Sequence, residues 1–260
     1  MDELEKLKET ILKEFPRLNR ESKFQFRCHK DINCFNKCCT DVNIFLTPYD
    51  IIRLKNHLHI SSQEFLDKYT FLPIDEKQNH PVVMLKMEQD ENKSCPFVRD
   101  SGCSVYEDRP WSCRMFPLGV ASPKENGTTG DEEFYFILDE PVCQGHKEQR
   151  LQTVEEWMED QEVKDYSEMG NQFKEISLHE YFKKGKQLEP AKQEMFYTVC
   201  YNIDKFREFV FESSFLKRFE INEDTIIKIK EDDKELLLFG LNWLRYCLFG
   251  EGTMKVSKSK

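Results

Sequence analysis

The placement of the cysteines constrains this chain more than any other feature. Eight of the ten cysteines in the 260-residue sequence lie between residues 28 and 143. They begin as C-x5-C-x3-C-C and continue as C-x7-C-x9-C before the eighth. Such close spacing lets one loop present several sulfurs, and thiolates are preferred ligands of zinc, copper(I) and iron–sulfur clusters. We therefore predict a metal–thiolate site with the ligands Cys28, Cys34, Cys38, Cys39, Cys95, Cys103, Cys113 and Cys143.

Eight thiolates would satisfy two tetrathiolate centres, or one centre with spare thiols. The adjacent pair Cys38-Cys39 bears on this choice, because neighbouring side chains diverge in extended backbone. The two sulfurs could face different metals, or one could bind while the other packs. Packing as small hydrophobic residues fits the eight less well, because few of them lie in periodic apolar segments. A redox disulfide relay is a further minor alternative. Cys200 and Cys247 do lie in helical apolar patterns, and for these two we predict core packing.

Two histidines compete with the cysteines as ligands. His29 follows Cys28, and His146 lies three residues after Cys143. Either imidazole could replace a sulfur, although such a residue is more often exposed or placed behind the ligands. The other histidines carry no spacing argument.

The segment around Cys113 is dense in charged and aromatic residues. Arg109 and Arg114 flank this cysteine, and cations near thiolates stabilise the negative charge of a thiolate–metal centre. The alternative is an ordinary salt-bridged turn. Trp111 and Phe116 are expected to pack over the centre and shield it from solvent.

Composition excludes several classes of function. The net charge of -10 argues against binding to a nucleic-acid phosphate backbone, which needs clustered Lys and Arg. Neither a signal peptide nor an apolar run near the roughly 18 residues that span a bilayer is present. We therefore expect a cytoplasmic protein, in which thiols persist as ligands rather than as disulfides. With 39% hydrophobic residues the chain has enough apolar material for a core.

Hydrophobic periodicity and capping residues predict an α+β fold. The expected organisation is an irregular cysteine-rich metal-binding domain with short strands and helices over residues 1–150, followed by a mainly helical region over residues 151–260. Helices are predicted at residues 1–15, 62–69, 191–211 and 233–248, and one more begins at a Thr47 cap and ends at about residue 57. Strands are predicted at 81–87 and 133–138. Capping boxes are predicted at Thr153/Glu156 and Ser177/Glu180.

The ordered motifs of the first half resemble a known family. These motifs are Phe26-x-Cys28, the run Ile44 to Leu54, Cys95-Pro-Phe-Val, Gly102-Cys103-Ser-Val-Tyr106 and Asp108-Arg-Pro-Trp-Ser-Cys-Arg-Met-Phe-Pro117. Over about residues 24–145 they are similar to the YkgJ-type cysteine-cluster proteins, which are described as zinc- or iron-chelating and often carry a C-x2-C-x2-C-C core. The first spacings here are x5 and x3, so the relative roles of Cys28 and Cys34 stay open. The resemblance implies a metal centre, and some relatives are linked to lysine methylation of flagellin.

Three functions follow from these observations. The first is an iron–sulfur protein with a redox or electron-transfer role. The second is a structural zinc protein whose C-terminal helices bind a protein partner. The third is a cluster-dependent protein lysine methyltransferase, although no G-x-G-x-x-G, Ser/His/Asp or H-E-x-x-H pattern is present. Catalytic residues, the substrate and the oligomeric state are not assigned by the sequence.

Overall fold

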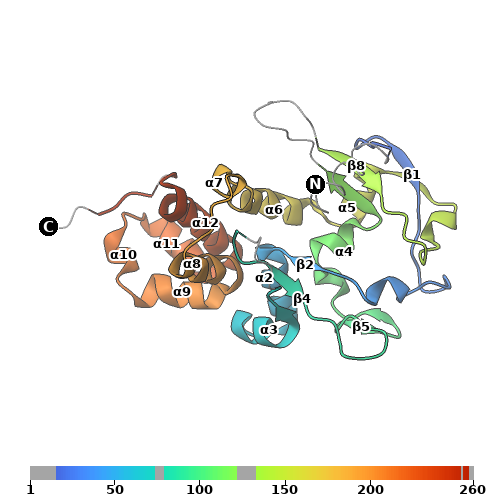
Figure 1. Cartoon of the computed structure of the whole chain (residues 1–260), viewed down its shortest axis with the longest axis horizontal. Helices are drawn as coiled ribbons and strands as arrows, with labels where there is room; N and C mark the ends of the chain where they lie inside the picture. Colours follow the sequence, from blue (N-terminus) through green and yellow to red (C-terminus); the bar gives the residue numbers. More distant parts are fainter. Residues whose placement is uncertain (1–15, 74–78, 122–132, 253, 258–260) are drawn as a thin grey trace.

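Short strands dominate the first half of the molecule and helices the second, which confirms the α+β prediction. The computed structural model describes residues 16–73, 79–121, 133–252 and 254–257. The helix predicted at residues 1–15 lies outside these ranges. Figure 1 shows the helices α8 to α12 gathered at one end, β1, β8 and α5 toward the other end, and α6 between them.

The described residues of the cysteine-rich half form four small antiparallel sheets rather than one large sheet. A three-stranded sheet has the order β2-β4-β3, and β5 pairs with β6, β7 with β8, and β1 with β9. The strands are β1 (Lys23–Gln25), β2 (Phe45–Leu46), β3 (Thr70–Phe71), β4 (Val83–Leu85), β5 (Val98–Arg99), β6 (Gly102–Cys103), β7 (Leu118–Ala121), β8 (Phe134–Ile137) and β9 (Leu151–Thr153). Both predicted strands are present as β4 and β8, each shorter than the sequence indicated.

Helix α2 (Pro48–Leu58) begins as its sequence predicts. The hydroxyl of Thr47 accepts a hydrogen bond from the Asp50 amide at 3.1 Å, and the Asp50 carboxylate accepts one from the Thr47 amide at 2.7 Å. This reciprocal capping box, with Pro48 at the first helical position, satisfies amides that the helix itself leaves unpaired. Helix α3 (Ser62–Tyr69) follows with Ser61 as its N-cap.

Helices account for most of the chain after residue 150. They are α5 (Val154–Asp160), α6 (Lys164–Ser177), α7 (Glu180–Lys183), α8 (Pro190–Tyr201), α9 (Ile203–Glu212), α10 (Phe215–Arg218), α11 (Glu223–Glu231) and α12 (Asp233–Phe249). The capping box at Thr153/Glu156 and the helix at 233–248 are confirmed.

Two helix predictions in this half are wrong. The single helix expected at 191–211 is broken at Asn202, whose side chain turns to cap α9 by accepting from the Lys205 amide. Ser177 does not begin a helix with Glu180, because α6 continues to Ser177 and His179 caps α7 instead. In both places a polar side chain that bonds the local backbone sets the boundary.

The two halves share one apolar core. Buried residues from Ile44 to Leu248 belong to a single cluster that includes residues of α2, β4, α8 and α12. Strand β1 pairs with β9, so the chain just past residue 150 returns to the start of the cysteine-rich part. The boundary predicted near residue 150 stays a prediction.

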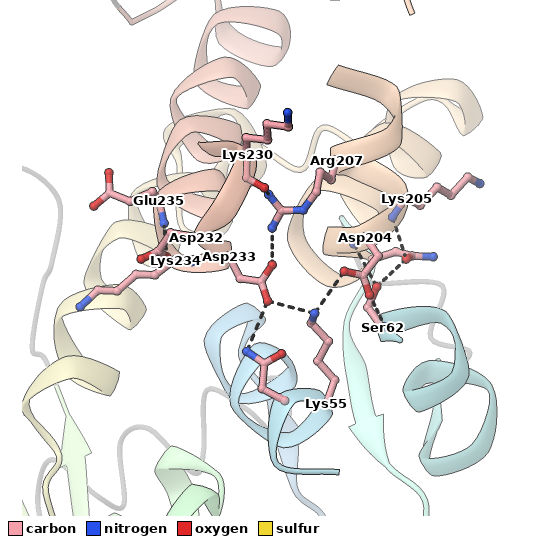
Figure 2. A network of polar contacts seen from close by, with 12 residues as sticks. Lys55, Ser62, Asp204, Lys205, Arg207, Lys230, Asp232, Asp233, Lys234 and Glu235 are labelled. Atoms are coloured by element: carbon pink, nitrogen blue, oxygen red, sulfur yellow. Dashed lines mark hydrogen bonds and ion pairs between the residues drawn. The ribbon is translucent and has the colours of Figure 1, made fainter. Parts of the chain in front are cut away.

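A buried ion-pair network joins α2 to the C-terminal helices. The Lys55 ammonium lies 3.1 Å from a carboxylate oxygen of Asp204 on α9 and 2.9 Å from one of Asp233 on α12 (Figure 2). Asp204 also accepts the Ser62 amide at 2.7 Å, and Asp233 pairs with Arg207. Because a buried charge is costly unless it is paired, this arrangement fixes α2 against α9 and α12.

No helix in the described part of the chain is both long and apolar enough to cross a bilayer.

Candidate metal centre

Four of the predicted ligands lie near one another around the loop that follows β1. We call Cys28, Cys34, Cys38 and Cys143 the outer group. Burial raises the pKa of the Cys28 thiol to about 11, with further increases from the nearby sulfurs of Cys38, Cys34 and Cys143. The pKa of Cys143 is raised by burial and again by Cys34 and Cys38. Cys28 and Cys38 are exposed, so this group reaches the surface.

The other four predicted ligands form a second group closer to α2. We call Cys39, Cys95, Cys103 and Cys113 the inner group. Burial raises the pKa of the Cys113 thiol to about 12, and the neighbouring Cys95 and Cys103 add to the increase. Cys39 is influenced by Cys95 and Cys113, and the Cys95 amide donates to the Cys39 carbonyl at 2.8 Å. All four side chains are partly buried.

The two groups meet at the adjacent pair Cys38-Cys39. Both residues lie in a single 3-10 helix, Lys37–Cys39. The Cys39 thiol hydrogen-bonds to the Cys38 sulfur, which lowers the pKa of Cys38 and raises that of Cys39. Apart from this bond, the Cys38 sulfur neighbours thiols of the outer group, and the Cys39 sulfur neighbours thiols of the inner group. This arrangement supports the idea that the two adjacent sulfurs face different centres.

The thiols of each group are neighbours, but they do not converge on one point. Within the described ranges, no three His, Cys, Asp or Glu side chains come close enough to hold a metal ion between them. The sulfurs of each group thus influence one another electrostatically, but they are not arranged in a coordination geometry. The donor chemistry nevertheless fits, since four thiols are the ligand set of a structural zinc or of an iron–sulfur cluster. The assignment of each cysteine as a ligand stays a prediction.

Backbone contacts bring the late cysteine Cys143 to the early loop. The Arg27 amide donates to the Gly145 carbonyl at 3.1 Å, and the Gln144 amide donates to the Cys34 sulfur at 3.2 Å. A methyl group on Gly145 would lie 2.4 Å from the Phe26 ring, so only glycine allows this approach.

Asp50 connects the inner group to α2, in addition to its bonds at the start of its own helix. Its carboxylate is fully buried and accepts the Trp111 amide at 2.7 Å, at the start of α4 (Trp111–Met115), which carries Cys113. One side chain thus caps two helices. Burial raises the pKa of Asp50 to about 6, although the hydrogen bonds from Trp111 and Thr47 oppose the increase. No sequence signal for the second cap exists, because it depends on a contact between distant segments.

Two more residues of α2 hold the loop between Cys103 and Cys113. Arg53 donates to a carboxylate oxygen of Asp108 at 2.7 Å, and the His57 ring lies 2.8 Å from the other oxygen. The second ring nitrogen of His57 lies 3.2 Å from the Ser104 carbonyl. Residues 50, 53 and 57 share one helix face, so α2 is the scaffold of the inner group.

The two arginines beside Cys113 have different surroundings. The Arg109 guanidinium lies near the Cys113 and Cys103 thiols and stacks 3.8 Å from the centroid of the Tyr106 ring. Arg114 is buried and turns toward α6, where it lies 4.4 Å from the Tyr166 ring centroid. The charge-compensating role predicted for both is therefore supported for Arg109, whereas Arg114 packs the fold.

The flanking histidines and aromatic residues lie around the outer group. His29 has a ring nitrogen 3.3 Å from a Glu148 oxygen, and His146 packs against the Phe26 ring at 5.1 Å. The Nε2 atom of His146 is buried and finds no hydrogen-bond partner among the described residues, so its role as an alternative ligand stays open. The Phe116 ring contacts Phe26 at 5.9 Å, on the outer side.

Cys200 and Cys247 lie away from both groups. Cys200 is buried in the shared core and Cys247 is partly buried against it, as their helical patterns predicted.

Irregular loops bring eight cysteines together in this half of the molecule, which is the arrangement of a cysteine-cluster segment. Residues 27–144 match the family model CxxCxxCC, described as a "Putative zinc- or iron-chelating domain". The matched segment contains all eight predicted ligands. The match confirms the resemblance seen in the sequence and supports metal binding by iron or zinc. Comparisons with curated proteins and with solved structures gave no match.

Proposed function

We propose that the chain is an iron–sulfur protein with an electron-transfer role, in which the outer and inner groups each hold a centre. The observation that carries this proposal is the junction, at Cys38-Cys39, of a group with two exposed cysteines and a group whose four cysteines are all partly buried. A cluster held by these thiolates would supply one-electron redox chemistry. An exposed site suits exchange with a partner protein, and a buried site suits protection from solvent.

The residues around the two groups have separable tasks in this proposal. Exposed Cys28 and Cys38 mark the surface where a redox partner protein would approach. Arg109, buried beside Cys103 and Cys113, offsets the negative charge that bound thiolates accumulate. The α2 scaffold keeps the inner loop in place.

Purification without oxygen tests this proposal. We expect a brown protein that contains iron and acid-labile sulfide and gives an electron paramagnetic resonance signal after chemical reduction. A colourless protein with stoichiometric zinc and no labile sulfide would contradict it.

Structural zinc is the second candidate, and the weak packing of the first cysteine loop favours it. None of the residues of the 3-10 helix Lys37–Cys39 is buried, and the neighbouring strands contain two or three residues each. Metal binding would then supply the folding energy that a small core does not. Zinc content and unfolding by a chelator, without any change in colour, would identify this case. The methyltransferase alternative predicts transfer from a methyl donor to a lysine-rich protein, and absence of transfer counts against it.

A further inference from the structure

A cavity of about 260 Å³ lies where α6 meets α4 and the β7–β8 hairpin. Trp111 and Met115 of α4 line it, four residues apart on one helix face. Cys113 is two residues from each and therefore projects from another face of α4. The cavity is thus separate from the inner group, in the region where α6 lies beside α4 and β8 in Figure 1.

Four aromatic residues contribute to the walls of the cavity, among aliphatic and polar side chains. Trp111, Tyr135, Tyr166 and Phe173 contribute rings, and Met115 adds a flexible apolar side chain. An apolar cavity of about 150 Å³ is large enough for benzene, so this volume suits a molecule of two fused rings. Flat ring systems also gain from stacking and edge contacts with aromatic walls.

Gly170 keeps this space open at a cost to its helix. It lies inside α6, where glycine is less favourable than alanine by about 1 kcal/mol. A methyl group there would meet no other heavy atom within 4 Å, so packing does not require glycine. Gly240 of α12 is a useful contrast, because a methyl group on it would lie 2.6 Å from Val199. Because Gly170 lines the cavity, a larger side chain at this position would extend into it.

The polar groups at the cavity favour a neutral ligand with a hydrogen-bond acceptor. Ser167 accepts the Trp111 indole N–H at 3.1 Å, and its hydroxyl proton has no acceptor among the described residues. The two cations that line the cavity are already neutralised, Arg20 by Glu155 at 2.7 Å and Lys174 by Glu133 at 3.0 Å. An anionic ligand would have to displace these carboxylates, whereas a carbonyl or ring-nitrogen acceptor could take the free hydroxyl proton.

We propose that this cavity binds a small, neutral, flat molecule of two fused rings that carries one hydrogen-bond acceptor. The site does not depend on which metal the cysteines hold.

Calorimetric titration of the full-length, metal-loaded chain tests the proposal with two probes. The probes are 1-indanone, a flat bicyclic ketone, and indane, which has the same ring skeleton without the carbonyl. We expect saturable one-to-one binding of both, with 1-indanone tighter by about 2- to 10-fold through one hydrogen bond. Absence of saturable binding to the unmodified chain would overturn the proposal.

Two variants locate the binding site. Gly170→Leu fills the cavity and should weaken both probes by at least about tenfold, because the ligand volume is taken. Gln172→Leu adds the same side chain at an exposed position of α6 outside the cavity lining and should leave binding unchanged. Unchanged binding in Gly170→Leu would overturn the proposal.

Ser167→Ala removes the hydroxyl that would donate to the ligand carbonyl, with little change in cavity volume. It should abolish the preference for 1-indanone over indane while retaining binding of indane. A preference that survives this change would contradict the assignment of Ser167. Circular dichroism of each variant checks that the fold is kept.

Discussion

The outer and inner cysteine groups each contain four thiols, yet their loops are held in different ways. The inner loop is fixed to one face of α2 by Asp50, Arg53 and His57. The outer loop is held mainly by backbone contacts, such as the Arg27 amide on the Gly145 carbonyl, and two of its cysteines are exposed. We therefore expect the inner group to keep its framework without metal, and the outer group to depend on metal for more of its order.

Metal removal should separate the two groups most strongly. After treatment with a chelator, we expect amide hydrogen exchange over residues 27–39 to accelerate by more than about 100-fold, because bound metal supplies folding energy there. Helix α2 should change by less than about tenfold. Exchange monitored by mass spectrometry measures both, with α12 as the internal control. Equal acceleration in both regions would remove the distinction.

Single cysteine variants should each remove one centre. Cys113→Ser is expected to lose the metal of the inner group, and Cys28→Ser the metal of the outer group. Each variant should therefore keep about half of the total metal, since each set supplies four ligands. Metal analysis of the purified proteins checks the values. Cys200→Ser is the matched control and should keep the full content. Complete loss in both ligand variants would mean that the groups form one cooperative unit.

Asp50→Asn should destabilise the scaffold of the inner group. The carboxylate accepts from the amides of both Thr47 and Trp111, and an asparagine would turn its own N–H donors toward one of them. We expect a loss of about 1–3 kcal/mol in the free energy of unfolding, measured by urea titration. Asp41→Asn, at an exposed ion pair with Lys93, should change it by less than about 0.5 kcal/mol. Equal effects would show that the double cap contributes little.

The smallest expected effect is a pH dependence at Asp108. Burial alone would raise the pKa of this carboxyl, but hydrogen bonds from His57 and Arg53 outweigh it and hold the pKa below its usual range. The resulting stabilisation is present above the ordinary pKa of about 3.9 and is lost as pH falls through the lower folded value. Asp108→Asn should therefore lose stability at neutral pH and differ less from the unmodified chain in acid. A pH-independent difference in unfolding temperature would contradict this account.

The sequence predicts local features of this fold well and long-range ones poorly. Thr47, Pro48 and Asp50 specify the start of α2 because all the groups involved lie within one turn. The pairing of β1 with β9 could not be predicted, since each strand has three residues and the partners are more than a hundred positions apart. The break at Asn202 was missed because the apolar pattern continues through it.

The same limit applies to the site. The spacing predicts which cysteines are candidate ligands, and the adjacent pair Cys38-Cys39 suggests that their sulfurs could face two centres. Which four belong together depends on how Cys143 and the loop from Cys95 to Cys113 fold back, and no spacing encodes that. Arg114 is adjacent to Cys113 in sequence and Arg109 is four residues away, yet packing against α6 turns the nearer arginine away from the thiols.

The contact between Cys143 and the early loop has a consequence for biosynthesis. At about 5–20 residues per second, a ribosome releases Cys28, Cys34 and Cys38 several seconds before the fourth member of their group. The outer thiols therefore spend that interval exposed, and a metal captured early would meet an incomplete ligand set. The outer group cannot be complete before Cys143 has emerged, so a full set of its four thiols exists only after more than half of the 260 residues have been made.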